Sequence, residues 1–191
     1  MMKIFGSSAA TMRFAIACIT VLLLSVMPTT WAQQKAADAK KQIVGVWKTV
    51  SDINKGSDGV VRSAFGPNPK GVFIFTASGR YASINTRPDI PKFASGNRMQ
   101  GTADENKAVV QGSIAHFGTY SISPDGKVLV LKVEGGTWPS WVGSEQKRDF
   151  TLAGDELKYT VTASIGGVSE LVYRRVNIFM KPYYSIYCNG Y

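Results

Sequence analysis

The chain has 191 residues, 45% of them hydrophobic, and a formal net charge of +9 at pH 7. A chain of this size suits one domain with a real hydrophobic core. The basic residues are spread along the sequence, and the longest basic clusters are pairs such as Lys40-Lys41 and Arg174-Arg175. Because a nucleic-acid-binding surface needs a clustered basic stripe, no nucleic-acid partner is predicted.

Residues 1–32 have the pattern of a secretory signal peptide. Lys3 and Arg13 supply the positive start, an uncharged apolar run follows from 14 to 27, and the small residue Ala32 marks a cleavage point. The apolar run is short for a membrane span, which needs about 20 residues. We therefore expect an exported protein, either periplasmic or secreted.

Cleavage after Ala32 leaves a mature chain that begins at Gln33. Its formal charge falls to +7 through the loss of two basic residues, and it has no integral membrane segment. An uncleaved anchor and a true start at Met12 are the alternatives. Cys188 is the one cysteine of this mature chain, so neither an internal disulfide nor a cysteine-based metal site is expected.

The next segments predict a β-rich domain after a short leader. Residues 33–42 are polar and small, which indicates a leader or a short helical turn. From Ile43 onward, β-branched and alternating segments recur with turn residues between them, as in KGVFIFT-ASG-RYASIN, TYSIS-PDG-KVLVLKVE and KRDFTL-AGD-ELKYTVT. Strands that recur every 8–12 residues or so are typical of an all-β sandwich or barrel.

Two segments depart from this rhythm. Thr102 is a suitable N-cap with acidic residues in the turn that follows, which predicts a helix from about Ala103 to Ser113. The stretch 86–101 contains two prolines and two glycines and predicts a long loop, a kind of segment that is often functional. The tail 177–191 carries four tyrosines and a phenylalanine and lies beyond the last predicted strand.

Several motifs resemble, in order, the lipocalin-like domain of many bacterial and some fungal proteins. They are GVWKTVS, FGPNPKG, RPDIPKFASGNRMQGT, HFGTY, VEGGTWPSWVGSEQKRDF and LVYRR, within residues 43–176. The resemblance implies an all-β, up-and-down antiparallel calycin-type β-barrel of about eight strands with one short helix. Eight strands enclose enough room for side chains or one small ligand.

The resemblance also implies structural roles for Gly45, Trp47 and one arginine of the last strand. Gly45 and Trp47 match the Gly-x-Trp of lipocalins, in which the tryptophan plugs the closed end of the barrel beneath an arginine of the last strand. Arg174 or Arg175 can supply this cation–π partner, and we predict that Arg174 does so. Trp141 is expected to be mostly core.

A small, largely apolar ligand is expected inside the barrel, because such pockets are apolar with a few placed polar groups. Trp138 lies in a stiff, glycine-flanked loop beside Pro139 and is expected at the rim. Arg148 is expected to face inward, since Phe150 continues its face of the strand. The full predicted lining is Phe73, Phe75, Tyr81, Phe93, Arg98, Tyr120, Trp138 and Arg148.

Two residues are candidates for catalysis. His116 is the single histidine and has a suitable unperturbed pKa for a general base, and Glu134 flanks the tryptophan segment. No metal-ligand spacing, serine-nucleophile elbow or nucleotide-binding glycine motif is present in the sequence. Neither a metal nor a cofactor is therefore predicted.

Three functions remain open at this stage. The first is an exported binding protein for a small apolar molecule. The second is a proton-transfer enzyme of isomerase or dehydratase type that uses His116 or Glu134. The third is a non-binding envelope protein that contacts a partner through its aromatic tail. An enclosed cavity without paired titratable groups favours the first function. A cavity that contains His116 or Glu134 near Arg98 or Arg148 favours the second, and a filled barrel favours the third. The sequence leaves the oligomeric state open.

Overall fold

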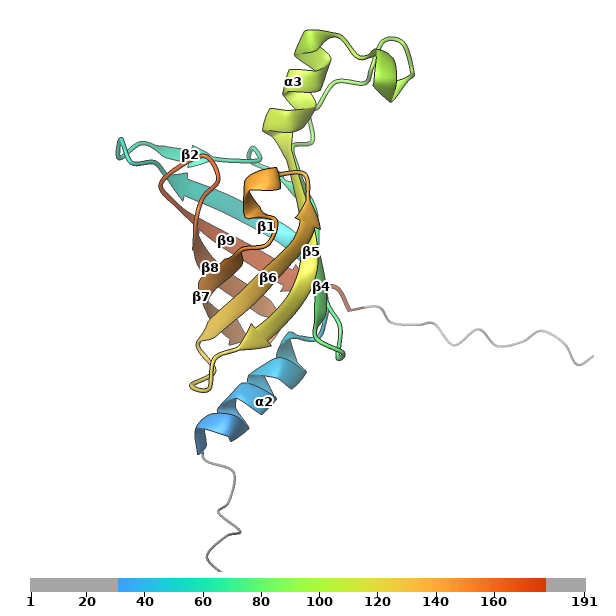
Figure 1. Cartoon of the computed structure of the whole chain (residues 1–191). Helices are drawn as coiled ribbons and strands as arrows, with labels where there is room; N and C mark the ends of the chain where they lie inside the picture. Colours follow the sequence, from blue (N-terminus) through green and yellow to red (C-terminus); the bar gives the residue numbers. More distant parts are fainter. Residues whose placement is uncertain (1–30, 178–191) are drawn as a thin grey trace, which may run out of the picture.

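Hairpins joined end to end build most of the molecule in the computed structural model, which describes residues 31–177 (Figure 1). Alternation of inward apolar and outward polar residues runs through the strands, as expected for a sheet with one face on a core. The elements in order are α2 (Trp31–Ile43), β1 (Gly45–Lys55), β2 (Val61–Ser63), β3 (Lys70–Phe75), β4 (Arg80–Thr86), the 3₁₀ turn η1 (Arg98–Gln100), α3 (Ala103–Gly112), β5 (Ser113–Ile122), β6 (Val128–Gly136), the 3₁₀ turn η2 (Pro139–Trp141), β7 (Glu145–Ala153), β8 (Glu156–Thr162) and β9 (Val168–Arg175).

Eight of the strands close into an antiparallel barrel. The order is β1-β3-β4-β5-β6-β7-β8-β9, and β1 pairs with β9 to complete the ring. The short β2 pairs only with the last residues of β1. The predicted up-and-down β-barrel of about eight strands is therefore confirmed, and closure leaves the ring without free edges.

Tight turns at one end of the barrel follow the predicted turn residues. Gly79 and Gly126 have φ angles of 84° and 76°, in the left-handed region that glycine adopts without steric cost. These turns join β3 to β4 and β5 to β6. They keep the connections short at this end, which α2 covers (Figure 1).

A tryptophan and an arginine plug the same end. Trp47 is fully buried, its Nε1 donates to the carbonyl of Ile43 at 2.8 Å, and the guanidinium carbon of Arg175 lies 4.1 Å from its ring centroid. Gly45 has a φ of +140°, and a Cβ there would lie 2.8 Å from Arg175 Nη1. Glycine at this position therefore makes room for the guanidinium.

The arginine that lies over the ring of Trp47 is Arg175, not Arg174 as predicted. Alternation on β9 buries Tyr173, exposes Arg174 and turns Arg175 partly inward. Arg175 also donates to the carbonyls of Val44 (2.9 Å) and Gln42, which attaches the end of α2 to the barrel. Two arginines in tandem cannot both face the barrel interior, since neighbouring strand residues point to opposite faces.

The predicted leader forms a helix. α2 begins at Trp31, just ahead of the expected cleavage point, and Ala39 packs against the barrel core. Lys40 lies with its Nζ 5.9 Å from the ring centroid of Tyr120. The described residues thus contain two α-helices, where one short helix was predicted.

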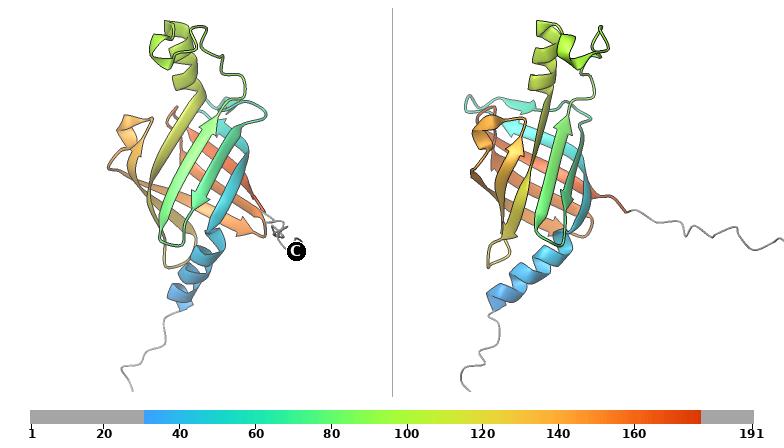
Figure 2. Two further views of the ribbon diagram at one scale, coloured as in Figure 1. Left: turned by 90° about the vertical axis from the view of Figure 1, so that its right-hand side faces the viewer. Right: turned by 45° about the vertical axis from the view of Figure 1, so that its right-hand side comes forward.

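The other end of the barrel carries longer connections. The predicted helix at this end is α3, which Thr102 and Glu105 start with a capping box. Together with the loop 87–101, α3 projects away from the barrel on the side opposite α2 (Figures 1 and 2). This end is the open one, and the candidate site lies there.

Residues 1–30 and 178–191 lie outside the described part of the chain. The signal peptide, the alternative start at Met12 and nearly all of the aromatic tail, including Cys188, therefore remain predictions. Between residues 31 and 177, the helices are too short or too polar to cross a membrane.

Candidate functional site

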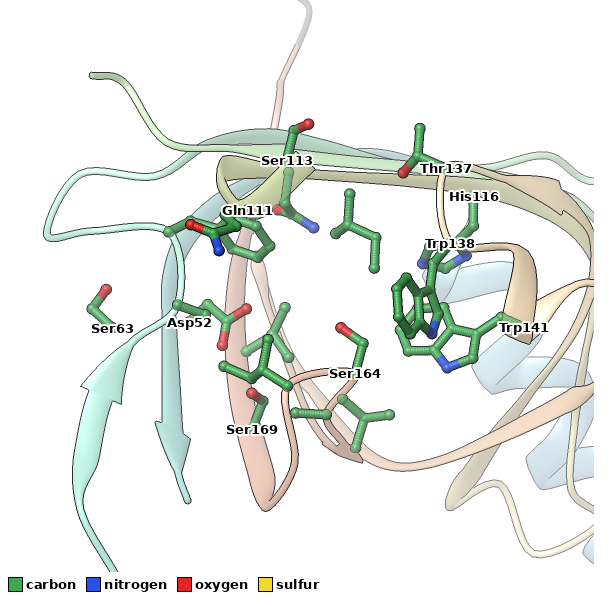
Figure 3. Close-up of a pocket in the computed structure, with 18 of the residues that line it drawn as sticks. Asp52, Ser63, Gln111, Ser113, His116, Thr137, Trp138, Trp141, Ser164 and Ser169 are labelled. Carbon is green, nitrogen blue, oxygen red and sulfur yellow. The ribbon is translucent and has the colours of Figure 1, made fainter. Parts of the chain in front are cut away.

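A cavity of about 610 Å³ occupies the open end of the barrel. Inward residues of the strands form its lower wall, and residues of α3, η2 and the β8–β9 loop form its rim. Figure 3 shows Asp52 and Ser169 on one side, and His116, Trp138 and Trp141 on the other. Most of the lining surface is apolar, with contributions from Val109, Ile114, Trp141, Val161, Ile165 and Leu171.

Aromatic rings fill the other half of the barrel. Phe73 and Phe75 lie with ring centroids 4.2 Å apart, Tyr81 meets Phe73 edge-on at 5.8 Å, and Tyr120 meets Phe75 at 5.0 Å. These four predicted lining residues are buried but do not line the cavity. The four residues form the core below the cavity. They were predicted as lining because alternation indicates which residues face inward, but not how deep along the barrel each one lies.

Two other predicted lining residues lie away from the cavity. Phe93 packs against Gly101 within its own loop, where an added Cβ would approach its ring to 2.7 Å. Arg98 lies exposed in η1. Both belong to the segment that projects beyond the barrel with α3, so neither is a cavity residue in this structure (Figure 2).

The two tryptophans of the PSW segment lie at the rim. Pro139 begins η2, and Trp138 is 40% exposed while Trp141 is partly buried. Both line the cavity, and Trp141 also meets the His116 ring edge-on at 5.4 Å. Trp141 was expected to be core, and it combines that packing with a place in the cavity wall.

Arg148 is the most deeply buried charged side chain of the cavity. Alternation on β7 buries Arg148 and Phe150 and exposes Lys147 and Asp149, so the arginine faces the interior. It is 1% exposed, and its guanidinium carbon lies 5.1 Å from the Tyr159 ring centroid. Its Nε and Nη1 have no hydrogen-bond partner among the described residues.

His116 lies on β5 and lines the cavity. It is 6% exposed, and its Nδ1 lies 3.1 Å from the hydroxyl of Tyr81. Burial, assisted by the positive charge of Arg148, lowers the pKa of His116 to about 3. The ring is therefore neutral at physiological pH, and its lowered pKa makes it a weak base for proton abstraction.

Glu134 lies outside the cavity. Its Oε2 accepts from Arg80 Nη2 at 2.8 Å in an ion pair on the barrel surface, where both side chains are well exposed. Glu134 is on β6, next to the inward Val133, and so has the outward position. It is not placed to act on a molecule in the cavity.

Asp52 is a cavity residue that the sequence analysis missed. It is 4% exposed, its Oδ1 has no hydrogen-bond partner among residues 31–177, and burial raises its pKa to about 6 despite the nearby Ser169 hydroxyl. A β-bulge between Thr49 and Ser51 shifts the register of β1 against β9. Strict alternation from Trp47 would have turned Asp52 outward, and the extra residue of the bulge turns it inward.

A chain of hydrogen-bonded polar groups, two of which line the cavity, crosses the barrel interior. Thr49 donates to Asn85 Oδ1 at 2.6 Å, Asn85 Nδ2 donates to the Tyr173 hydroxyl at 3.5 Å, and that hydroxyl lies 3.0 Å from the hydroxyl of Tyr159. In this surrounding of paired groups, Asp52 and Arg148 stand out as charged side chains with unused hydrogen-bonding atoms.

The closed antiparallel barrel with one plugged end and one open cavity is the architecture of the calycin class. The family model of the lipocalin-like domain matches residues 44–173, so the chain belongs to the lipocalin-like domain family. The recognition made from the sequence motifs is thereby confirmed.

Comparison with solved structures finds similar barrels at low sequence identity. A redesigned β-barrel is 14% identical and covers 72% of this chain and 95% of its own, with a TM-score of 0.39. A lipocalin-like protein from Bacteroides uniformis is also 14% identical and covers 71% of this chain and 99% of its own, with a TM-score of 0.39. A mutant of the fluorescent protein UnaG is 15% identical and covers 71% and 97%, with a TM-score of 0.34. A search of the curated proteins found no match.

Proposed function

We propose that this protein is an exported carrier that binds a small, largely apolar molecule in its open-end cavity. The observation that carries the proposal is the mostly apolar cavity of about 610 Å³ above a filled aromatic core. Its volume is within the range typical of small-molecule sites, about 300–1,000 Å³. A barrel packed along its whole length would have favoured a non-binding envelope protein instead.

The test is a cavity-blocking variant with a matched control. Ile114 lines the cavity, whereas Ile84 on the neighbouring strand is 47% exposed and is not among the lining residues. Ile114→Trp should reduce binding of a neutral apolar fluorescent probe at least about tenfold, since the new ring occupies ligand volume. Ile84→Trp should bind the probe like the parent. Equal binding by both variants, with both folded, would contradict the cavity as the binding site.

Native mass spectrometry of protein purified from its own host complements this test. A co-purified small molecule that is missing from Ile114→Trp would identify the ligand directly. For the export part of the proposal, N-terminal sequencing of the mature protein should begin at Gln33. An intact chain from Met1 or Met12 in the membrane fraction would contradict export by cleavage.

A proton-transfer enzyme of isomerase or dehydratase type is the second candidate, and Asp52 is the observation that favours it. Its carboxyl group lies in the cavity with an unpartnered Oδ1 and a pKa of about 6, which is close to the value an acid–base catalyst needs. Asp52 takes this role in place of Glu134, which is outside the cavity, and of His116, whose lowered pKa makes it a weak base. Asp52→Asn should then abolish turnover of the co-purified molecule while binding is kept, whereas a pure carrier shows no turnover.

A further inference from the structure

Arg148 places a positive charge in the cavity wall, and Asp52, the carboxyl group that also lines the cavity, is not in contact with it. No carboxylate oxygen among residues 31–177 lies within 4.0 Å of its guanidinium, although five other basic side chains there have such partners. Arginine stays protonated at all ordinary pH values. A buried, unpaired charge is costly, and natural proteins keep such a group where something else pairs with it.

The surroundings of Arg148 offer it a ring face but few acceptors. Tyr159 provides the ring at 5.1 Å, and its hydroxyl is engaged with that of Tyr173 at 3.0 Å. His116 is neutral, and Arg62, the other arginine of the lining, is paired with Asp58, so the unpaired positive charge of the lining is that of Arg148. The Tyr159 ring also holds the guanidinium in one place, which limits the entropy lost when an acceptor binds.

We propose that the bound molecule carries a carboxylate, which pairs with Arg148 at the base of the cavity while the apolar body extends toward Trp138 and Trp141 at the rim. This inference rests on the proposed binding function and names the chemical class of its ligand. Guanidinium and carboxylate groups match in geometry and form the stronger, charge-assisted class of hydrogen bond. The apolar walls then contact the body of the ligand, and the single arginine sets its orientation.

The test compares head groups on one chain length. Decanoate and decanol are measured by displacement of the neutral apolar probe from the unmodified protein at pH 7.5. Decanoate should bind at least about tenfold more tightly, because a hydrogen bond to a charged group contributes more than one to a neutral group. Equal affinities, or tighter binding of decanol, would overturn the inference while the proposed carrier function stands. Binding of neither compound, with no effect of Ile114→Trp on the probe, would overturn both.

Two variants assign the preference to the residue. Arg148→Met keeps a long apolar stem without the charge and should remove the preference for decanoate while decanol still binds. Arg174→Met, at an exposed position on β9, should keep the preference of the parent. Retention of the preference in Arg148→Met would contradict the assignment to Arg148. Should that variant fail to fold, the head-group comparison on the unmodified protein and on Arg148→Lys decides the matter, since Arg148→Lys should still favour decanoate.

Discussion

The two ends of the barrel each hold an arginine over an aromatic ring, but among residues 31–177 only one of these arginines has a carboxylate partner and hydrogen-bond acceptors. Arg175 lies 4.1 Å from the ring of Trp47, donates to two backbone carbonyls and has Asp155 at 3.5 Å. Arg148 lies 5.1 Å from the ring of Tyr159 and keeps two nitrogen atoms without partners among the described residues. The same pair of side-chain types thus closes one end of the molecule and leaves free hydrogen-bond donors at the other.

The difference follows from what surrounds each guanidinium. At the closed end, the chain entering β1 from α2 brings carbonyl groups next to the last strand. At the open end, the loop 87–101 and most of α3 project away from the barrel (Figure 1), and the cavity lies in the interior above the aromatic core (Figure 3). We therefore expect the closed end to contribute mainly to stability, and the open end to carry the proposed binding function.

The largest effect is expected from removal of the plug. Trp47→Ala should lower the free energy of unfolding by about 3–5 kcal/mol, because it empties a fully buried site under Arg175. Urea unfolding followed by circular dichroism measures this loss. Trp138→Ala, at the exposed rim, is the control and should lose much less. A Trp47→Ala protein as stable as the parent would show that the closed end is not the stabilising one.

The next effect concerns the pH dependence of stability at the open end. Burial raises the pKa of Asp52 from 3.8 to about 6. The contribution of Asp52 to the free energy of unfolding is therefore fully present below pH 4 and is lost as pH rises through 6. The pKa difference between the unfolded and folded states corresponds to about 3 kcal/mol of stability. Asp52→Asn should therefore be more stable than the parent at pH 7.5, by up to this amount, and similar to it at pH 4.

His116 has the opposite slope, since its pKa is lowered from 6.5 to about 3. Its contribution is present above pH 6.5 and is lost as pH falls, so between pH 4 and 6 it offsets that of Asp52. The other charged or titratable side chains of the cavity are Arg62, Arg148 and Tyr159. Urea unfolding is measured at pH 4, 5, 6 and 7.5. The free energy of unfolding of the parent should change little from pH 4 to 6, whereas that of Asp52→Asn should fall toward pH 4. Identical profiles would contradict these assignments.

A direct comparison of the two arginines should give a smaller effect. Arg175→Met should cost about 1.5–3 kcal/mol, the scale of hydrogen bonds from a charged donor. Arg148→Met should cost less or even stabilise the apo protein, because it removes a buried and unpaired charge. Chemical denaturation of both variants in parallel decides this. Equal losses would mean that Arg148 is as structural as Arg175.

The smallest effect is expected at the rim. Trp138→Ala should weaken binding of the apolar probe by about 1–2 kcal/mol, the scale of one lost aromatic contact. Stability should change less than in Trp47→Ala, since Trp138 is 40% exposed. Titration and thermal unfolding of the same samples measure both quantities. An unfolded Trp138→Ala protein, with normal binding per folded molecule, would assign the PSW segment to the core.

Local patterns were enough to predict an all-β domain and the direction of many side chains, and the resemblance of the motifs to the lipocalin-like domain predicted the barrel. Alternation placed Arg148 on the face of Phe150, and both are buried. The same reasoning could not separate Phe73 and Tyr120, which fill the core, from Arg148, which lines the cavity, because depth along the barrel depends on strand tilt and on what the connections cover. Phe93 and Arg98 were predicted in the cavity lining but lie outside it for a related reason, since a loop pattern does not show in which direction the loop projects.

The sequence by itself determined the hairpin rhythm, the tight turns at glycine, the cap of α3 and the family, since all of these depend on neighbours along the chain. The tertiary structure alone decided that a bulge turns Asp52 inward, that Arg175 rather than Arg174 covers Trp47, and that Arg148 remains unpaired at a cavity. These outcomes depend on the register between strands distant in sequence, and a shift of one residue in that register moves a side chain to the opposite face of the sheet.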